Sequence, residues 1–150
     1  MNQSVSRISV PVTVTQLGYA GLIPFVTLSV SLWVLPAGFH QPVNDALLAY
    51  AAIILSFMGA VHWGLAIATE DEPDKVQLAA SVVPALVAWF ATLAPVLINY
   101  SVLVITFAGL CVYDSRMAGL NKVPAWYPRL RMPLTAVVIL SLLLAQISLL

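Results

Sequence analysis

Charged residues are scarce in this chain of 150 residues. They make up 8% of the sequence, whereas 61% of the residues are hydrophobic; an ordinary soluble domain has about 25% charged residues. Six Lys/Arg balance six Asp/Glu, so the formal net charge is zero. So few charges cannot cover a soluble domain of this size. The composition excludes a soluble monomer, a disordered chain and a protein that binds nucleic acid through a basic surface, and it leaves a polytopic membrane protein.

Cysteine is nearly absent too, since Cys111 stands alone inside an apolar run. A single thiol excludes an intramolecular disulfide and any metal site of the multiple-cysteine kind. The sequence also lacks a Walker-type phosphate loop, a zinc pattern, a Ser–His–acid set and an acidic residue in the middle of a hydrophobic run. We therefore expect no catalytic residue, no metal ligand and no resident cofactor.

The hydrophobic runs predict five transmembrane helices in one all-α membrane domain over residues 1–150. A helix needs about 20 mostly apolar residues to cross the hydrocarbon core. The predicted spans cover residues 17–35, 46–68, 76–93, 97–113 and 134–150. Four spans are the alternative, but residues 76–113 are too long for one helix and contain a turn signal at 95–100. The first run is kept as a mature span because it is longer than a signal-peptide core.

The basic residues indicate the orientation of these spans. With five spans, all six of them fall on one side of the membrane: Arg7, Lys75, Arg116, Lys122, Arg129 and Arg131. The positive-inside rule then predicts a cytoplasmic N-terminus and an external C-terminus. The acidic residues of 70–74 lie on the same side, where we interpret them as a solvated turn. We expect a multi-pass protein of the bacterial inner membrane.

Small residues recur every four positions along the second predicted span, at Ala52, Ser56, Ala60 and Gly64. Close approach between membrane helices is typical of such a stripe, which Gly59 widens. We therefore predict that the stripe faces a neighbouring helix. The alternative is that small residues are simply common in membrane spans.

Two prolines, Pro24 and Pro84, lie inside the first and third predicted spans. Each removes a helix hydrogen bond and frees a carbonyl one turn earlier. We predict helix kinks at both positions, at a similar depth below the cytoplasmic side.

His62 lies beside Trp63 within the second predicted span. A polar ring inside a membrane needs a partner, and its own helix offers none within one turn. We expect the partner to be an oxygen from the first or third span, or else an open cytoplasmic cleft near Asp114 and Arg131. His62 then either joins two helices through one hydrogen bond or belongs to a proton-handling or quinone site.

A second polar group is predicted on the same side of the membrane. Asp114 ends the fourth predicted span, and Arg129, Arg131 and Thr135 lie at the entry of the fifth. Asp114 can pair with either arginine across the helix ends. The arginines can also anchor the helix at the bilayer surface or hold a lipid phosphate or a partner's acidic face.

Several motifs resemble a bacterial family of unknown function that includes the mitochondrial "transmembrane protein sixty-nine". The most specific are His-Trp-Gly at 62–64 and Leu-Arg-Met-Pro-Leu-Thr at 130–135. Further similar stretches lie at residues 17–25, 50–57, 83–89 and 124–127. The resemblance implies a small integral protein of the inner-membrane type, and it brings no catalytic residue.

The functional hypothesis from the sequence is a non-catalytic accessory or assembly subunit that acts by helix association. Its partners would be the lipid bilayer and another inner-membrane protein or further copies of the chain, with no nucleic acid. The alternative is a quinone- or proton-handling protein with a cytoplasm-facing site around His62. A small transporter that works as an oligomer is the third hypothesis.

The predicted topology can be tested with a reporter enzyme fused after Leu150. Five spans place that fusion outside the cytoplasm, so an externally active reporter such as alkaline phosphatase is expected to work there. A reporter that is active only in the cytoplasm would contradict the five-span topology.

Overall fold

The fold is known from a computed structural model, which describes residues 10–69 and 75–150. Helices account for every regular element in these ranges, and no strand is present in them. They are α1 (Val12–Ala20), α2 (Ile23–Val34), the short 3-10 helix η1 (Ala37–Phe39), α3 (His40–Thr69), α4 (Lys75–Thr92), α5 (Val96–Gly119) and α6 (Tyr127–Ser148).

Five helical segments in the described ranges are long and apolar enough to cross a membrane, which confirms the predicted number of spans. They are Val12–Val34, Ala37–Ala68, Lys75–Thr92, Val96–Gly119 and Tyr127–Ser148. Large apolar side chains such as Ile53, Ile105 and Leu140 point outward and are at least 60% exposed. A protein with so much exposed apolar surface contacts the lipid bilayer directly. Arg7 and the acidic residues at 70–74 lie outside the described residues.

The helix bounds differ from the predicted spans at several ends. The first span consists of two helices, because a turn at residues 21–22 interrupts the helix between α1 and α2. α5 continues past residue 113 to Gly119, and α6 begins at Tyr127 rather than at residue 134. Pro128 fits the first turn of α6, where its missing N–H has no intrahelical partner to lose. Hydropathy identifies only the apolar part of a helix, and the helix itself continues into the polar residues on either side.

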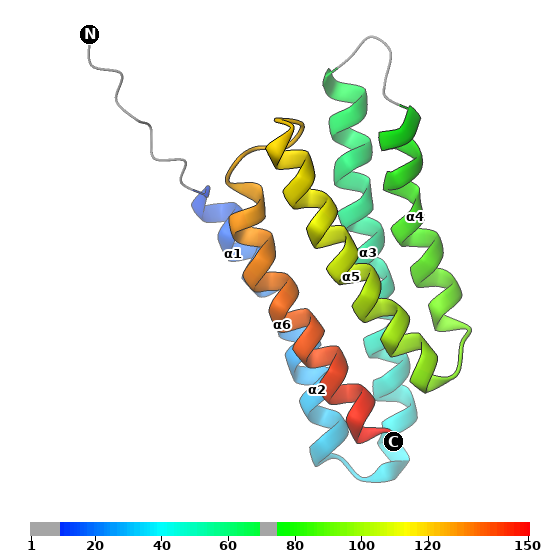
Figure 1. Ribbon diagram of the computed structural model, residues 1–150. Coiled ribbons are helices and arrows are strands. Elements are labelled where there is room, and N and C mark those ends of the chain that lie inside the picture. Colours follow the sequence, from blue (N-terminus) through cyan, green and yellow to red (C-terminus); the bar gives the residue numbers. More distant parts are fainter. Residues whose placement is uncertain (1–9, 70–74) are drawn as a thin grey trace, which may run out of the picture.

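The membrane helices run side by side as a bundle (Figure 1), and the contacts between them close into a ring. Neighbours around it pack in the order α2, α3, α4, α5 and α6, and α6 returns to α2. α1 rests on α6. One end of the bundle holds the end of α3, the start of α4, the end of α5 and the start of α6 (Figure 1). We name it the basic end, because Lys75, Arg116, Lys122, Arg129 and Arg131 all lie toward it.

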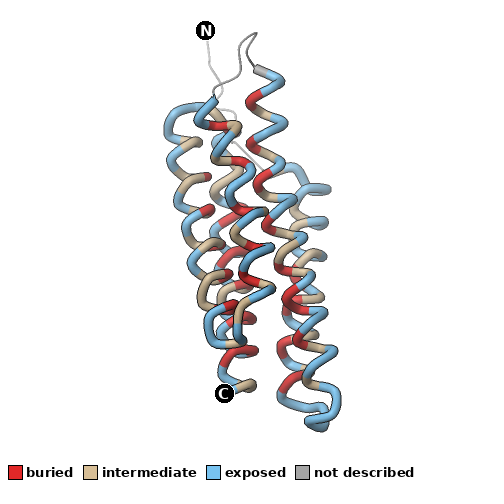
Figure 2. The backbone as a smooth tube through the Cα atoms, turned by 90° about the vertical axis from the view of Figure 1, so that its right-hand side faces the viewer, coloured by how far each residue is buried: buried red, intermediate tan, exposed pale blue. Residues whose placement is uncertain are grey.

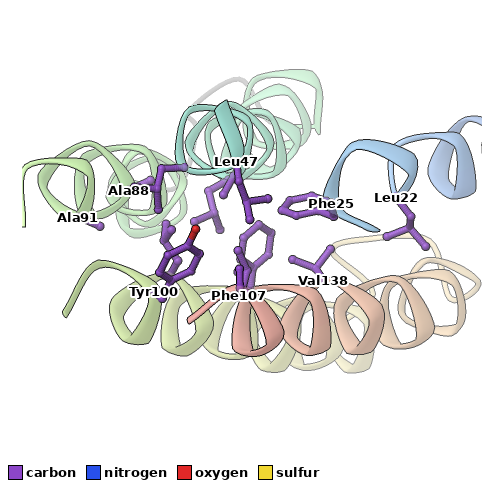
Figure 3. Close-up of a cluster of buried hydrophobic side chains, with 14 of the residues drawn as sticks. Leu22, Phe25, Leu47, Ala88, Ala91, Tyr100, Phe107 and Val138 are labelled. Carbon is purple, nitrogen blue, oxygen red and sulfur yellow. The ribbon is translucent and has the colours of Figure 1, made fainter. Parts of the chain in front are cut away.

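Buried residues gather on the inward faces of the helices (Figure 2). Phe25, Leu47, Tyr100 and Phe107 point toward one another in the middle of the bundle and are almost fully buried (Figure 3). The ring of Phe25 meets the ring of Phe107 edge to face, with the centroids 5.9 Å apart. This aromatic contact joins α2 to α5 across the ring of helices.

Within residues 10–69 and 75–150, no helix covers the small-residue stripe of α3, so the predicted packing against a neighbouring helix is not found inside this bundle. Ser56, Ala60 and Gly64 are exposed and Ala52 is only half-buried. The buried face lies one position away. It consists of Ala51, Leu55, Gly59, His62 and Ala66, which follow the helical period of 3.6 residues more closely than an exact repeat of four.

Gly59 is the small residue that permits close packing. A Cβ atom at Gly59 would collide with the carbonyl oxygen of Ser81 on α4. The contact lies beside Pro84, which is buried inside α4. Pro24 instead lies in the first turn of α2, just after the break in the first span. The carbonyl of Gly21 at that break accepts a hydrogen bond from the Tyr50 hydroxyl at 2.9 Å.

Polar contacts also join the helices at the end opposite the basic end, where the sequence analysis named no site residue. The Tyr100 hydroxyl donates to Asn44 Oδ1 at 3.0 Å, linking α5 to α3. Gln146 on α6 donates to the carbonyl of Leu97 at 2.9 Å. The sequence does not show that these residues pair, since the partners are distant in it.

Replacement of Gly59 by leucine is expected to disrupt the packing of α3 against α4. The collision involves a backbone oxygen, which cannot move without shifting α4, so we expect a cost of at least about 1–3 kcal/mol. Gly64→Leu is the matched control, because a Cβ at Gly64 meets nothing within 4 Å. Thermal unfolding in mild detergent measures both. Equal melting temperatures for the two variants would contradict this packing.

Candidate functional site

Three polar side chains from three helices meet in the half of the bundle near the basic end. Asp114 on α5 lies between His62 on α3 and Arg131 on α6. Its Oδ1 is 2.6 Å from His62 Nε2, and its Oδ2 accepts a hydrogen bond from Arg131 Nε at 2.8 Å. We name these residues the Asp114 cluster. His62 is 0% exposed, Asp114 1% and Arg131 5%, so water hardly reaches the group.

Further contacts hold His62 in place. The ring of Tyr113 packs edge-on against the imidazole, with the centroids 4.8 Å apart. Gln77 on α4 donates a hydrogen bond to the backbone carbonyl of His62 at 3.4 Å. His62 Nε2 carries the proton toward the carboxylate, and Nδ1 is buried without a hydrogen-bond partner in the described part of the chain. His62 is therefore enclosed by α3, α4 and α5.

The structure selects among the alternatives that the sequence left open. The partner of His62 is Asp114 on the fourth span, not an oxygen from the first or third span. Arg131 contacts Asp114, whereas Arg129 is exposed. Trp63 is 45% exposed and does not belong to the buried cluster. Because α5 continues to Gly119, Asp114 lies inside a helix and not at its end.

The charges of the Asp114 cluster cancel when the imidazole is neutral. The carboxylate compensates the guanidinium, and both carboxylate oxygens have a partner. A buried ion pair of this kind adds little net stability compared with apolar residues, but removing one partner leaves an uncompensated charge. The cluster therefore fixes the relative positions of α3, α5 and α6.

A cavity of about 320 Å³ lies next to the cluster. We name it the Arg131 pocket. Its walls come from α1, α2, α3, α5 and α6, and fourteen of its seventeen lining residues are apolar or glycine. The exceptions are Tyr127, Arg131 and Thr135. Exposed Leu17 on α1 and Phe57 on α3 are among the lining residues, so the pocket reaches the lipid-facing surface.

The three polar residues of the pocket each have a buried atom without a hydrogen-bond partner among the described residues. These atoms are the Tyr127 hydroxyl, Arg131 Nη2 and the Thr135 hydroxyl. The residues are spaced by four along α6, so they lie on one face of the helix. An unsatisfied buried polar atom costs about 1–3 kcal/mol, so a polar group from outside the chain that reached these atoms would stabilise the site.

The sequence placed the site around His62, but His62 and Asp114 do not line the Arg131 pocket. The polar residues that line the pocket are Arg131 and Thr135, which the sequence analysis named as site candidates, and Tyr127, which it mentioned only as part of the similar stretch 124–127. The spacing of four between Tyr127, Arg131 and Thr135 would have placed the three side chains on one helix face. The predicted span began at residue 134, so the sequence analysis did not treat Tyr127 and Arg131 as parts of that helix. Within residues 10–69 and 75–150, no group of three His, Cys, Asp or Glu side chains is arranged to hold a metal ion.

Loss of the Asp114 carboxylate is expected to destabilise the bundle strongly. Asp114→Ala leaves Arg131 charged and unpaired in a buried place, which costs about 3–5 kcal/mol. Asp45→Ala is the control, because Asp45 is exposed at the opposite end and accepts hydrogen bonds from nearby Gln41 and Asn44, so its loss is expected to cost about 1 kcal/mol. Thermal unfolding in detergent compares the two. Similar melting temperatures would show that the cluster does not hold the helices together.

Comparison with known proteins places the chain in a family. Residues 10–147 match the family described as "Protein of unknown function (DUF3429)". The chain is 44% identical over 131 residues to Transmembrane protein 69 of Xenopus tropicalis, which covers 84% of this chain and 50% of that protein. It is 28% identical over 130 residues to Transmembrane protein 69 of Mus musculus, with 85% and 53% covered. The chain spans about half the length of these curated relatives. No solved structure matches.

The resemblance inferred from the motifs at 62–64 and 130–135 is thereby confirmed, and the relatives are also named as transmembrane proteins. Together with the five apolar helices, this establishes a multi-pass membrane protein. The chain belongs to the family of proteins of unknown function DUF3429, which includes Transmembrane protein 69.

Proposed function

We propose that this membrane protein binds a small lipid-soluble molecule in the Arg131 pocket, without catalysing its conversion. The observation that carries the proposal is that three polar residues on one face of α6, each with a buried unpartnered atom among the described residues, line a cavity that is otherwise apolar. An apolar pocket with a few convergent polar groups is the usual form of a small-molecule site.

The chemistry of the lining favours binding over catalysis. Arg131 is the one charged residue among the lining residues, and none of them is a histidine, a carboxylate or a cysteine. Proton handling between the Asp114 cluster and a ligand would have to pass through Arg131. A guanidinium keeps its proton in proteins, so it is a poor relay. His62 and Asp114 then serve as positioning residues that orient Arg131.

A quinone, the ligand named from the sequence, has the matching parts: an apolar ring and tail with carbonyl oxygens at one end. The site differs from the sequence hypothesis in its access. His62 is enclosed, and the pocket borders the lipid-facing surface instead of opening only toward the cytoplasm. In this proposal the protein lies in the bacterial inner membrane with its basic end toward the cytoplasm, as the basic residues favour.

Helix association is the second candidate function, favoured by the exposed side of α3. Ser56, Ala60 and Gly64 form a shallow small-residue surface that no helix of the described chain covers. Such surfaces let membrane helices approach closely. An accessory or assembly subunit would use this face toward a partner subunit. Cysteine cross-linking from Ala60→Cys in native membranes tests it, and cross-linked product is expected only if this face contacts protein.

Retention of a small molecule tests the binding function. Val61 on α3 lines the Arg131 pocket, so Val61→Phe fills part of it. Val82→Phe on α4 is the matched control, because Val82 is exposed and outside this pocket. Native mass spectrometry of protein purified in mild detergent measures the bound molecule. We expect wild type and Val82→Phe to retain it, and Val61→Phe to retain about tenfold less. Equal retention by the three folded proteins would contradict the proposal.

A further inference from the structure

We propose that the Arg131 pocket selects a neutral lipid-soluble carbonyl compound over an anionic amphiphile, and that Asp114 sets this selectivity. The inference rests on the proposed function, because it names the class of ligand that the pocket takes. It follows from three properties of the pocket: the type of its free polar atoms, the charge already compensated beside them, and the apolar lining.

The free polar atoms call for a ligand with acceptor oxygens. Arg131 Nη2 can only donate hydrogen bonds, and the hydroxyls of Tyr127 and Thr135 can both donate. A cationic head group would meet the guanidinium and would offer no acceptor. A carbonyl, a carboxylate or a phosphate oxygen would satisfy the donors, so this step leaves neutral and anionic acceptors.

Charge then separates the two remaining classes. The Asp114 carboxylate contacts Arg131 Nε at 2.8 Å and already compensates its charge. An anionic head group would therefore bring one uncompensated negative charge into a buried place, at a high desolvation cost. A neutral carbonyl accepts the same hydrogen bonds without changing the charge of the site. Asp114 does not line the pocket, so it acts on the ligand through Arg131 and is a positioning residue.

The dimensions and the lining agree with a compact apolar body next to that carbonyl. The cavity of about 320 Å³ is at the small end of ligand sites. Phe25, Phe107 and Leu134 provide apolar walls, and exposed Leu17 and Phe57 leave a route for an alkyl tail to reach the bilayer. The other large cavity lies between α4 and α5. Its polar lining residues are Thr106, whose hydroxyl already bonds to its own helix, and Tyr113, which packs against His62.

The test compares three probes that share a ten-carbon chain: a decyl benzoquinone, decanoate and decyltrimethylammonium. Binding is measured in nanodiscs by calorimetry, with all probes in the same buffer. For wild type we expect the quinone to bind about tenfold or more tightly than decanoate, and the ammonium probe not to bind. Decanoate binding as tightly as the quinone, or more tightly, would overturn the inference.

Variants show which residues produce the preference. Asp114→Asn leaves the guanidinium uncompensated, so its preference is expected to reverse toward decanoate. Thr135→Val removes one donor, keeps the shape of the side chain and is expected to weaken quinone binding about fivefold to tenfold. If Asp114→Asn does not fold, Thr135→Val and Tyr127→Phe still test the donors. An unchanged quinone affinity in both of these variants would overturn the inference.

Val61→Phe distinguishes this inference from the proposed function. If no probe binds wild type, or if Val61→Phe binds the quinone as wild type does, the proposed function fails. If Val61→Phe loses all binding but wild type prefers decanoate, the pocket binds a ligand and only the assigned ligand class is wrong. Val82→Phe serves again as the control with wild-type affinities.

Discussion

A carboxylate inside a membrane helix bundle has to be compensated by groups from neighbouring helices, because neither lipid nor water solvates it there. Asp114 meets this constraint with His62 on α3 and Arg131 on α6. Lipid supplies no hydrophobic drive for helices to associate, so close packing and polar contacts of this kind fix their positions. The arrangement of three of the five spans near the basic end depends on this one side chain.

The same constraint shapes the pocket. Asp114 contacts the Nε atom of Arg131, and Nη2 is buried without a partner among the described residues. The guanidinium is thus held by this carboxylate, and the residue also lines the apolar cavity. The Thr135 and Tyr127 hydroxyls lie on the same face of α6 and extend this row of donors. The rigid part of the site is the ion pair, and the part that can bind a ligand is next to it.

Three further contacts hold helices of the bundle together. Gly59 lets α3 approach the backbone of α4 closely, and the aromatic contact of Phe25 with Phe107 joins α2 to α5. At the opposite end, Tyr100 and Asn44 link α5 to α3 by one hydrogen bond. Each of these contacts uses a residue type that permits short distances or satisfies a single polar group. None of them involves a second buried charge.

The number of spans and the fold class could be predicted from the sequence, because hydropathy and the placement of basic residues are local properties. His62, Asp114, Arg131 and Thr135 could be named as well, since polar residues are rare in apolar runs. The face of α3 was assigned incorrectly. A repeat of exactly four residues drifts around a helix, and only contact with α4 shows that the buried face includes Gly59.

The sequence by itself thus determined that this is a membrane protein with five spans and a polar group near its basic end. Which side chains pair with Asp114 was decided only by the tertiary structure. Asp114 lies 52 residues from His62 and 17 residues from Arg131, and nothing local to those positions decides whether Arg129 or Arg131 turns inward. Helix rotation and helix packing decide it, because they set which side chains share the interior. The pocket beside Arg131 arises in the same way, from α1, α2, α3, α5 and α6 meeting around one face.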